Sequence, residues 1–420
     1  MTLAARQRYN GTTMSEEQYL NFNLRIEETD DGYVTRVVES PAGEAVMPFT
    51  VPFSLDQWRR LLASLEAPQA PGSQAAKGVE ETLRQWGERL FHALFQDHVL
   101  ACYRASRHLA YQSRAHLRLL LDTNPVPHLA SLPWEFLLDP VHDEFLAATP
   151  AMTFSRYTHL MHRVPPLQVE WPLRVLVVIA NPSSYPPVHV EREWLGLVDT
   201  LDYLAAEGRL ILERLTRPTL FEFQRRLRQR RYQIVHFIGH SLFNEQTGEG
   251  HLVFEDEMGR SRLVSGQHLG ALMRDHQDLR LVILQGSQGT YATGYGAFVH
   301  VAQSLVQRGM AAVLATQFEW PQEVALGFLE PFLSAVAGCR PVDEAVAAAR
   351  MALGGDSTLA WGAPILWMRT PDGVLLSDGP LPAQPVPAEL NQRVAFRLNS
   401  LRIRTATRET IARWASEPPG

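Results

Sequence analysis

Cysteine and long apolar runs are scarce in this chain of 420 residues, and it has no excess of positive charge. It has two cysteines, Cys102 and Cys339, which excludes a disulfide framework and a cysteine-rich zinc site. No apolar run approaches the roughly 20 residues of a membrane-spanning helix, and the first residues lack the apolar core of a secretory signal. A net charge of -6 disfavours nucleic acid as a partner. We therefore expect a cytoplasmic protein that binds neither membrane nor nucleic acid.

What the chain does have is a regular alternation of strand and helix patterns. Near-continuous apolar segments, such as LRVLVVIA at 173–180 and LRLVIL at 279–284, are typical of strands buried on both faces of a sheet. Strands are expected at 173–180, 210–215, 233–238, 279–284 and 311–316, with helices at 191–206, 218–230, 266–275, 296–308 and 321–337. This order predicts an α/β fold with a mostly parallel sheet flanked by helices on both faces.

The two ends of the chain differ from this pattern. Short alternating segments and a linker rich in Pro, Gly and Ser predict a small N-terminal β-rich extension over 1–78. The α/β domain is expected over 79–372, beginning with one long helix at 79–112 and a strand at 116–121. A Pro-rich linker and a C-terminal amphipathic helix are expected over 373–420. That helix could pack on the domain or dock a partner module.

Two of the expected strands end in residues whose side chains could take part in catalysis. The strand at 233–238 continues into GHS, which contains His240, and the strand at 279–284 continues into QGSQG, which contains Ser287. In parallel α/β sheets, functional residues gather at the carboxyl ends of strands. The 47 positions between His240 and Ser287 are enough for a helical crossover between neighbouring strands. Both side chains can then lie over one cleft, as a nucleophile and its base require.

These segments resemble the motifs of the CHAT family. YQIVHFIGHS at 232–241 is similar to its histidine motif, and LRLVILQGSQG at 279–289 is similar to its nucleophile motif, which carries a cysteine. Further segments across roughly 80–372 also resemble the family and occur in its order, among them LASLPWEFLLDP, VAQSLVQRGMAAVLATQF and WGAPILWMRTPDG. CHAT domains belong with caspases and separases in clan CD. The resemblance therefore implies a caspase-like fold and a cysteine endopeptidase activity that needs no cofactor.

The resemblance also assigns roles to residues. It implies that His240 is the general base or acid, that position 287 is the nucleophile, and that the backbone N–H groups of Ser241 and Ser287 form the oxyanion hole. The pocket for the residue before the scissile bond would be lined by Thr316, Gln317, Phe318, Glu319 and Trp320. From the sequence, Glu255 and Asp256 could supply an acidic pocket for a basic substrate side chain or belong to a hairpin turn.

Ser287 departs from the family, which has cysteine at this position. A thiol already holds a few per cent thiolate at neutral pH, whereas a hydroxyl ionises far less readily. A dyad suited to sulfur would leave Ser287 a poor nucleophile, so the chain as written is expected not to cut. The serine is either an engineered substitution or the mark of a natural pseudo-peptidase. A true serine hydrolase elbow needs glycine at position 285, where Gln285 stands, and a histidine late in the chain.

Other features have simpler explanations. His236 and His240 lie on a strand and its loop, where their rings cannot share a metal, so we expect no metal site and a core position for His236. The resemblance implies a protein substrate, such as a gasdermin-like or other effector, and a sensor or activator protein in bacterial defence or programmed cell death. Two alternatives remain, namely an inactive protein-binding scaffold and a regulatory module.

Overall fold

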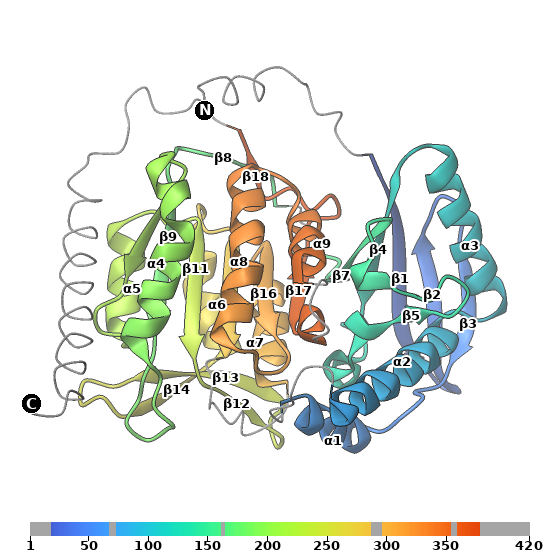
Figure 1. Cartoon of the computed structure of the whole chain (residues 1–420), viewed down its shortest axis with the longest axis horizontal. Coiled ribbons are helices and arrows are strands. Elements are labelled where there is room, and N and C mark those ends of the chain that lie inside the picture. The colour runs from blue at the N-terminus through green and yellow to red at the C-terminus, as the bar shows by residue number, and fades with distance from the viewer. Residues whose placement is uncertain (1–17, 67–72, 161–163, 287–295, 354–358, 379–420) are drawn as a thin grey trace, which may run out of the picture.

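The computed structural model describes residues 18–66, 73–160, 164–286, 296–353 and 359–378, and one large sheet runs through them (Figure 1). Its strands, in spatial order, are β10 (Leu210–Arg214), β9 (Leu173–Ile179), β11 (Ile234–Gly239), β15 (Leu281–Gly286), β16 (Ala312–Thr316), β17 (Pro364–Met368), β7 (Met152–Tyr157), β4 (His116–Asp122), β1 (Tyr19–Thr29), β2 (Gly32–Glu39) and β3 (Ala45–Phe49). Most neighbours are parallel. The antiparallel pairs are β16 with β17, β1 with β2, and β2 with β3.

Helices cover both faces of this sheet. They are α1 (Leu55–Glu66), α2 (Gln74–Leu94), α3 (Asp97–Gln112), α4 (Val190–Ala206), α5 (Leu220–Gln229), α6 (Gly266–Arg274), α7 (Ala297–Gln307), α8 (Gln322–Ala337) and α9 (Val342–Leu353). Figure 1 shows α4 and α8 in front of the sheet, with α5, α6 and α7 behind it. The fold class predicted from the sequence, a mostly parallel sheet flanked by helices on both faces, is confirmed.

The apolar strands bury alternate side chains in two separate cores. In β9, Val175 and Val177 belong to the core that includes α4 and α8, whereas Leu176 and Val178 belong to the core formed with α5, α6 and α7. Successive strand residues point to opposite faces, so a strand covered on both sides must be apolar at nearly every position. This double burial explains the continuous apolar segments of the sequence.

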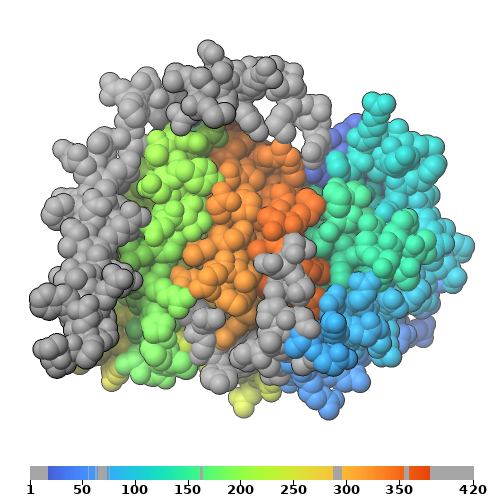
Figure 2. Space-filling model, in the orientation of Figure 1, coloured from blue at the N-terminus to red at the C-terminus, as the bar shows by residue number. Residues whose placement is uncertain are grey.

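The N-terminal strands extend the same sheet. β1 pairs in parallel with β4, with Tyr19 opposite His116, and β2 and β3 follow as antiparallel neighbours toward the sheet's edge. Figure 2 shows these elements, with α1 to α3, as the blue and cyan end of the molecule, packed directly against the remainder. The small β-rich extension expected near the N-terminus thus adds strands to the sheet of the α/β domain.

The single long helix expected at 79–112 is wrong. The structure has two helices there, α2 and α3, separated at Phe95 and Gln96, and Asp97 begins α3 with a φ of +36°. The break lets Phe95 join an aromatic cluster, because its ring centroid lies 4.6 Å from both Phe91 and Tyr103. Neither glycine nor proline stands at the break, which falls at Phe95 and Gln96, so burial of three aromatic rings outweighs the local preference for a continuous helix.

A buried ion pair holds residues 127–135, which follow β4, against the sheet. Arg156 of β7 lies 2.6 Å from Glu135, and neither side chain is exposed. Arg156 also donates to the carbonyl groups of Ala130 and Leu132, in and just after a short 3-10 helix at Pro127–Ser131. The guanidinium therefore fixes residues 127–135 against the sheet.

Candidate active site

β11 and β15 are parallel neighbours that end at the same level. Their register runs from Ile234 opposite Leu281 to Gly239 opposite Gly286. His240 and Ser287 are the next residues after this last pair, so the two motifs lie on adjacent strands, as the sequence predicted. Ser287 itself lies outside the described residues. The geometry of the site is therefore built from His240 and from the residues around the end of β15.

His240 is held in one orientation by a short loop after β9. Its side chain is buried, its Nε2 lies 2.9 Å from the carbonyl oxygen of Pro186, and its ring is 4.9 Å from that of Tyr185. A carbonyl can only accept a hydrogen bond, so Nε2 carries the proton and Nδ1 carries a lone pair. Among the described residues Nδ1 has no partner, although it is buried.

The electrostatic environment keeps this imidazole neutral. Burial lowers the pKa of His240 below its ordinary value of 6.5, and the hydrogen bond to Pro186 opposes this effect only in part. At neutral pH the ring is therefore uncharged, with the free lone pair of Nδ1 available to accept a proton. A general base needs this protonation state.

Glu255 holds the loop that orients His240. One oxygen of its carboxylate accepts a hydrogen bond from the backbone N–H of Asn181 at 2.8 Å, and the side chain of Asn181 accepts one from the N–H of Val188 at 2.8 Å. Pro186 lies between these two anchor points. Glu255 thus acts on the fold of residues 181–188, through which it positions the ring of His240.

Asp256 belongs to the hairpin turn, one of the two readings left open by the sequence. It lies between β13 (Glu249–Glu255) and β14 (Ser261–Ser265), which pair as an antiparallel hairpin with β12 (Ser241–Asn244). Its carboxylate accepts from the N–H groups of Met258 and Arg260 and forms an ion pair with Arg260 at 2.9 Å. The carboxylate is engaged within its own turn.

Ser241 presents a backbone N–H beside His240. Val253 of β13 donates to the carbonyl of His240 at 3.0 Å, and Ser241 is opposite Leu252 in the register. Hydrogen-bonded and non-hydrogen-bonded pairs alternate in an antiparallel ladder, so the N–H of Ser241 points away from β13. The hydroxyl of Ser241 is buried and has no partner among the described residues.

Thr316 fixes the last residue of β15. Its hydroxyl oxygen accepts a hydrogen bond from the N–H of Gly286 at 3.2 Å, immediately before position 287. Thr316 is buried, and Glu319, further along the same segment, is half-buried. The end of β16 therefore constrains the backbone that leads into the nucleophile motif.

Gln317, Phe318 and Trp320, which the resemblance placed in a substrate pocket, are buried in the structure. The side chain of Gln317 donates to the carbonyl of Gly362 at 2.6 Å, and the ring of Phe318 stacks on that of Phe136. Among the described residues, these contacts hold the segment after β16 against Gly362 and Phe136. That the segment also lines a substrate pocket stays a prediction.

A second histidine links the two strands below the site. Nε2 of His236 in β11 lies 3.0 Å from the side-chain oxygen of Gln285 in β15, and both residues are buried. Burial lowers the pKa of His236 to about 4, so its ring is neutral and donates to Gln285. The predicted core position of His236 is confirmed. Within the described ranges, no three His, Cys, Asp or Glu side chains gather as metal ligands would.

Two residues beside His240, Pro186 and Tyr185, were not predicted from the sequence. Pro186 acts through a backbone carbonyl, which leaves no mark in side-chain chemistry, and Tyr185 acts as a ring beside the imidazole. One signal was available, because both residues follow β9 at the carboxyl edge of the sheet, where functional loops are expected.

The fold is an α/β fold with a mostly parallel sheet, and the histidine motif and the strand leading to position 287 lie side by side at its carboxyl edge. A family model described as "CHAT domain" matches residues 84–416, so the chain belongs to the CHAT-domain family, as its motifs indicated. No curated protein matches the chain. Every helix in the described part of the chain is too short or too polar to cross a bilayer.

The similar solved structures include two of the separase–securin complex of Saccharomyces cerevisiae. One is 10% identical, with a TM-score of 0.46, and the match covers 83% of this chain and 30% of that one. The other is 13% identical, with a TM-score of 0.35, and covers 79% of this chain and 21% of that one. The present chain thus spans less than a third of either chain.

Proposed function

We propose that the edge of the sheet at His240 is a protein-cleaving site in which residue 287 is the nucleophile. The observation that carries this proposal is the state of His240, which follows the strand next to β15: its Nε2–H is fixed on Pro186, and its Nδ1 has no partner among the described residues. A base held by one nitrogen and free at the other is the arrangement that activates a nucleophile on the adjacent strand.

The proposed reaction uses this geometry in two stages. Nδ1 of His240 takes the proton of the side chain at 287, which attacks the peptide carbonyl, and the oxyanion is held by the N–H groups of Ser241 and residue 287. The imidazolium then gives its proton to the leaving amine, which departs as the acyl-enzyme forms. Water, deprotonated by Nδ1, hydrolyses the acyl-enzyme and restores the side chain at 287.

Serine at position 287 weakens this chemistry. In serine peptidases the second nitrogen of the histidine faces a carboxylate, which stabilises the imidazolium as it forms. In this chain that nitrogen faces the neutral carbonyl of Pro186, and burial further disfavours the charged ring. A thiolate–imidazolium pair tolerates such a partner better, because the thiol is far more acidic than a hydroxyl. The chain as written is therefore a binding protein with at most a slow peptidase activity.

Membership of the CHAT family supports the finer proposals about the biological setting. The substrate would be a partner protein, such as a gasdermin-like or other effector, in a bacterial defence or cell-death system of the cytoplasm. A sensor or activator protein would control the site. The second candidate function, a pseudo-peptidase scaffold that binds without cutting, is favoured by one observation, the serine at position 287.

The test is to supply the thiol. The variant Ser287→Cys is incubated with peptide acyloxymethyl ketones and with candidate partner proteins, beside the chain as written and Ser287→Cys/His240→Ala. We expect covalent labelling and cleavage with Ser287→Cys alone, and a loss of about 10²-fold or more without His240. The acid limb of kcat/KM should lie below pH 6.5, because His240 must be neutral in the free enzyme and its pKa is lowered. A Ser287→Cys variant that neither labels nor cuts would rule out the peptidase, and retained partner binding would then favour the scaffold.

A further inference from the structure

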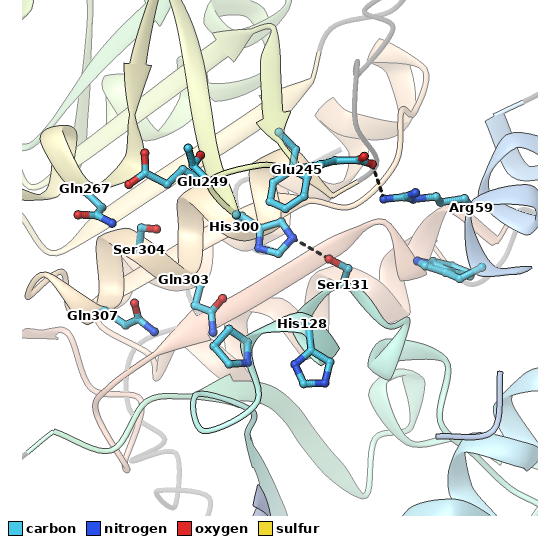
Figure 3. A pocket seen from close by; sticks show the side chains of 15 residues that line it. Arg59, His128, Ser131, Glu245, Glu249, Gln267, His300, Gln303, Ser304 and Gln307 are labelled. Atoms are coloured by element: carbon cyan, nitrogen blue, oxygen red, sulfur yellow. Dashed lines mark hydrogen bonds and ion pairs between the residues drawn. The ribbon is translucent and has the colours of Figure 1, made fainter. Parts of the chain in front are cut away.

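A cavity of about 560 Å³, lined by both polar and apolar surface, lies beside the hairpin that starts after His240 (Figure 3). Its walls come from α1, the 3-10 helix Pro127–Ser131, β12 and β13 with their connection, α6 and α7. Cavities of roughly 300–1,000 Å³ are the usual size for small ligands and for the side chains of bound peptides. The proposed peptidase chemistry does not use this cavity.

Most of the charge in the cavity is already neutralised. Arg59 forms an ion pair with Glu245 at 2.9 Å, as the dashed line in Figure 3 shows. Nε2 of His300 lies 2.8 Å from the hydroxyl of Ser131, and burial lowers the pKa of His300 to about 4, so this ring is neutral. Glu249 remains, with no ion pair among the described residues. The cavity thus holds one uncompensated carboxylate.

The cavity also contains a donor without an acceptor. The side-chain nitrogen of Gln303 is buried and has no hydrogen-bond partner among the described residues, and only 4% of this residue is exposed. A buried donor left unpaired is costly, and each such group in a folded protein calls for an explanation. Ser304 and Gln307 of α7 also line this cavity (Figure 3). A ligand with a carbonyl oxygen would satisfy Gln303.

We propose that this cavity binds a peptide segment that presents an arginine or lysine side chain. The cationic group pairs with Glu249, and a backbone carbonyl of the same segment accepts from Gln303. The stacked rings of Phe243 and His300, 4.2 Å apart, give the aliphatic part of the side chain an apolar wall. An anionic ligand would face the unpaired carboxylate, and an apolar ligand would leave the amide of Gln303 unsatisfied.

The position of the cavity relates it to the proposed active site. Phe243 lies three residues beyond His240 in β12, a distance of roughly 10 Å at about 3.3 Å per strand residue. An extended peptide covers the same distance in about three residues. This step rests on the proposed function, because it makes the basic residue of the substrate lie about three positions from the bond that is cleaved.

Direct binding tests the proposal without any catalysis. The full chain is titrated with acetyl-Gly-Gly-Arg-Gly-Gly-amide and with the same peptide carrying citrulline, which is neutral and nearly isosteric, and dissociation constants are measured by ligand-observed NMR. We expect the arginine peptide to bind at least ten-fold more tightly, and Glu249→Gln to remove that preference. Glu257→Gln is the matched control, since Glu257 is an exposed acid in the β13–β14 turn and does not line the cavity.

Gln303→Leu separates the two contacts. It should weaken both peptides by the same factor, and it should raise the melting temperature of the free chain, because it removes the unpaired buried amide. Equal affinity for the two peptides, no binding of either, or an arginine preference that survives Glu249→Gln would overturn the proposal. Free arginine binding as tightly as the peptide would overturn the peptide segment as the ligand. None of these outcomes depends on whether Ser287→Cys cuts.

Discussion

His236 should make this protein lose stability in mild acid, and the size of the loss can be worked out. The ring is buried and neutral, with a pKa of about 4, whereas an unfolded histidine titrates near 6.5. Between these two values the unfolded chain binds more protons than the folded chain, so the free energy of unfolding falls as the pH is lowered. The loss is negligible above pH 6.5 and reaches its limit below pH 4. From pH 7 to pH 5 it amounts to about 2 kcal/mol.

The variant His236→Gln isolates this contribution. A glutamine nitrogen can replace Nε2 and still donate to Gln285, but it does not titrate in this range. Urea unfolding at pH 7 and pH 5 gives the loss for each protein, and the chain as written should lose about 2 kcal/mol more than the variant. NMR of the His236 ring should show a neutral imidazole at pH 5. An equal loss in both proteins, or a ring that titrates near pH 6.5, would refute the reasoning.

Two further predictions concern the packing around the sheet. Gly87→Ala should destabilise the protein by about 1–3 kcal/mol, because its new Cβ would overlap the carbonyl oxygen of Phe136. Gly78 lies in the same helix but faces open space, so Gly78→Ala should instead stabilise the protein by about 0.5–1 kcal/mol. Urea unfolding of both variants checks this, and equal effects would contradict it. Arg156→Met should cost about 3–5 kcal/mol, since Glu135 is left charged and buried, and adding Glu135→Leu should recover most of the loss. A double variant no more stable than the single one in the same assay would count against this account.

Local pattern predicted the strands that are buried on both faces and missed others for a physical reason. β9 and β15 are apolar at nearly every position, which identified them. β7 is equally buried, but it contains Thr153 and Arg156, whose partners Asp343 and Glu135 lie elsewhere in the sequence. A polar residue whose partner is distant in sequence is predicted to be exposed when only the neighbouring residues are considered. β7 was therefore not predicted.

The candidate site divides in the same way. His240 and the strand that leads to Ser287 could be predicted because their chemistry lies in side chains at the ends of apolar strands. The orienting contact could not, because Pro186 contributes a main-chain carbonyl and Glu255 acts on that loop through the main-chain N–H of Asn181. Such contacts depend on how the loop after β9 folds over the sheet. The types of the side chains alone do not predict how this loop folds.

The pairing of β17 has a consequence for how the chain must be made. β17 lies between β16 and β7, and its partner β7 precedes it by about two hundred residues. During synthesis, β7 and β16 therefore each have one edge without a strand partner until Pro364–Met368 has left the ribosome. Open strand edges recruit other chains. A nascent or truncated product ending before residue 364 should thus be prone to aggregate, and the last part of the described sheet to emerge is the one that closes it.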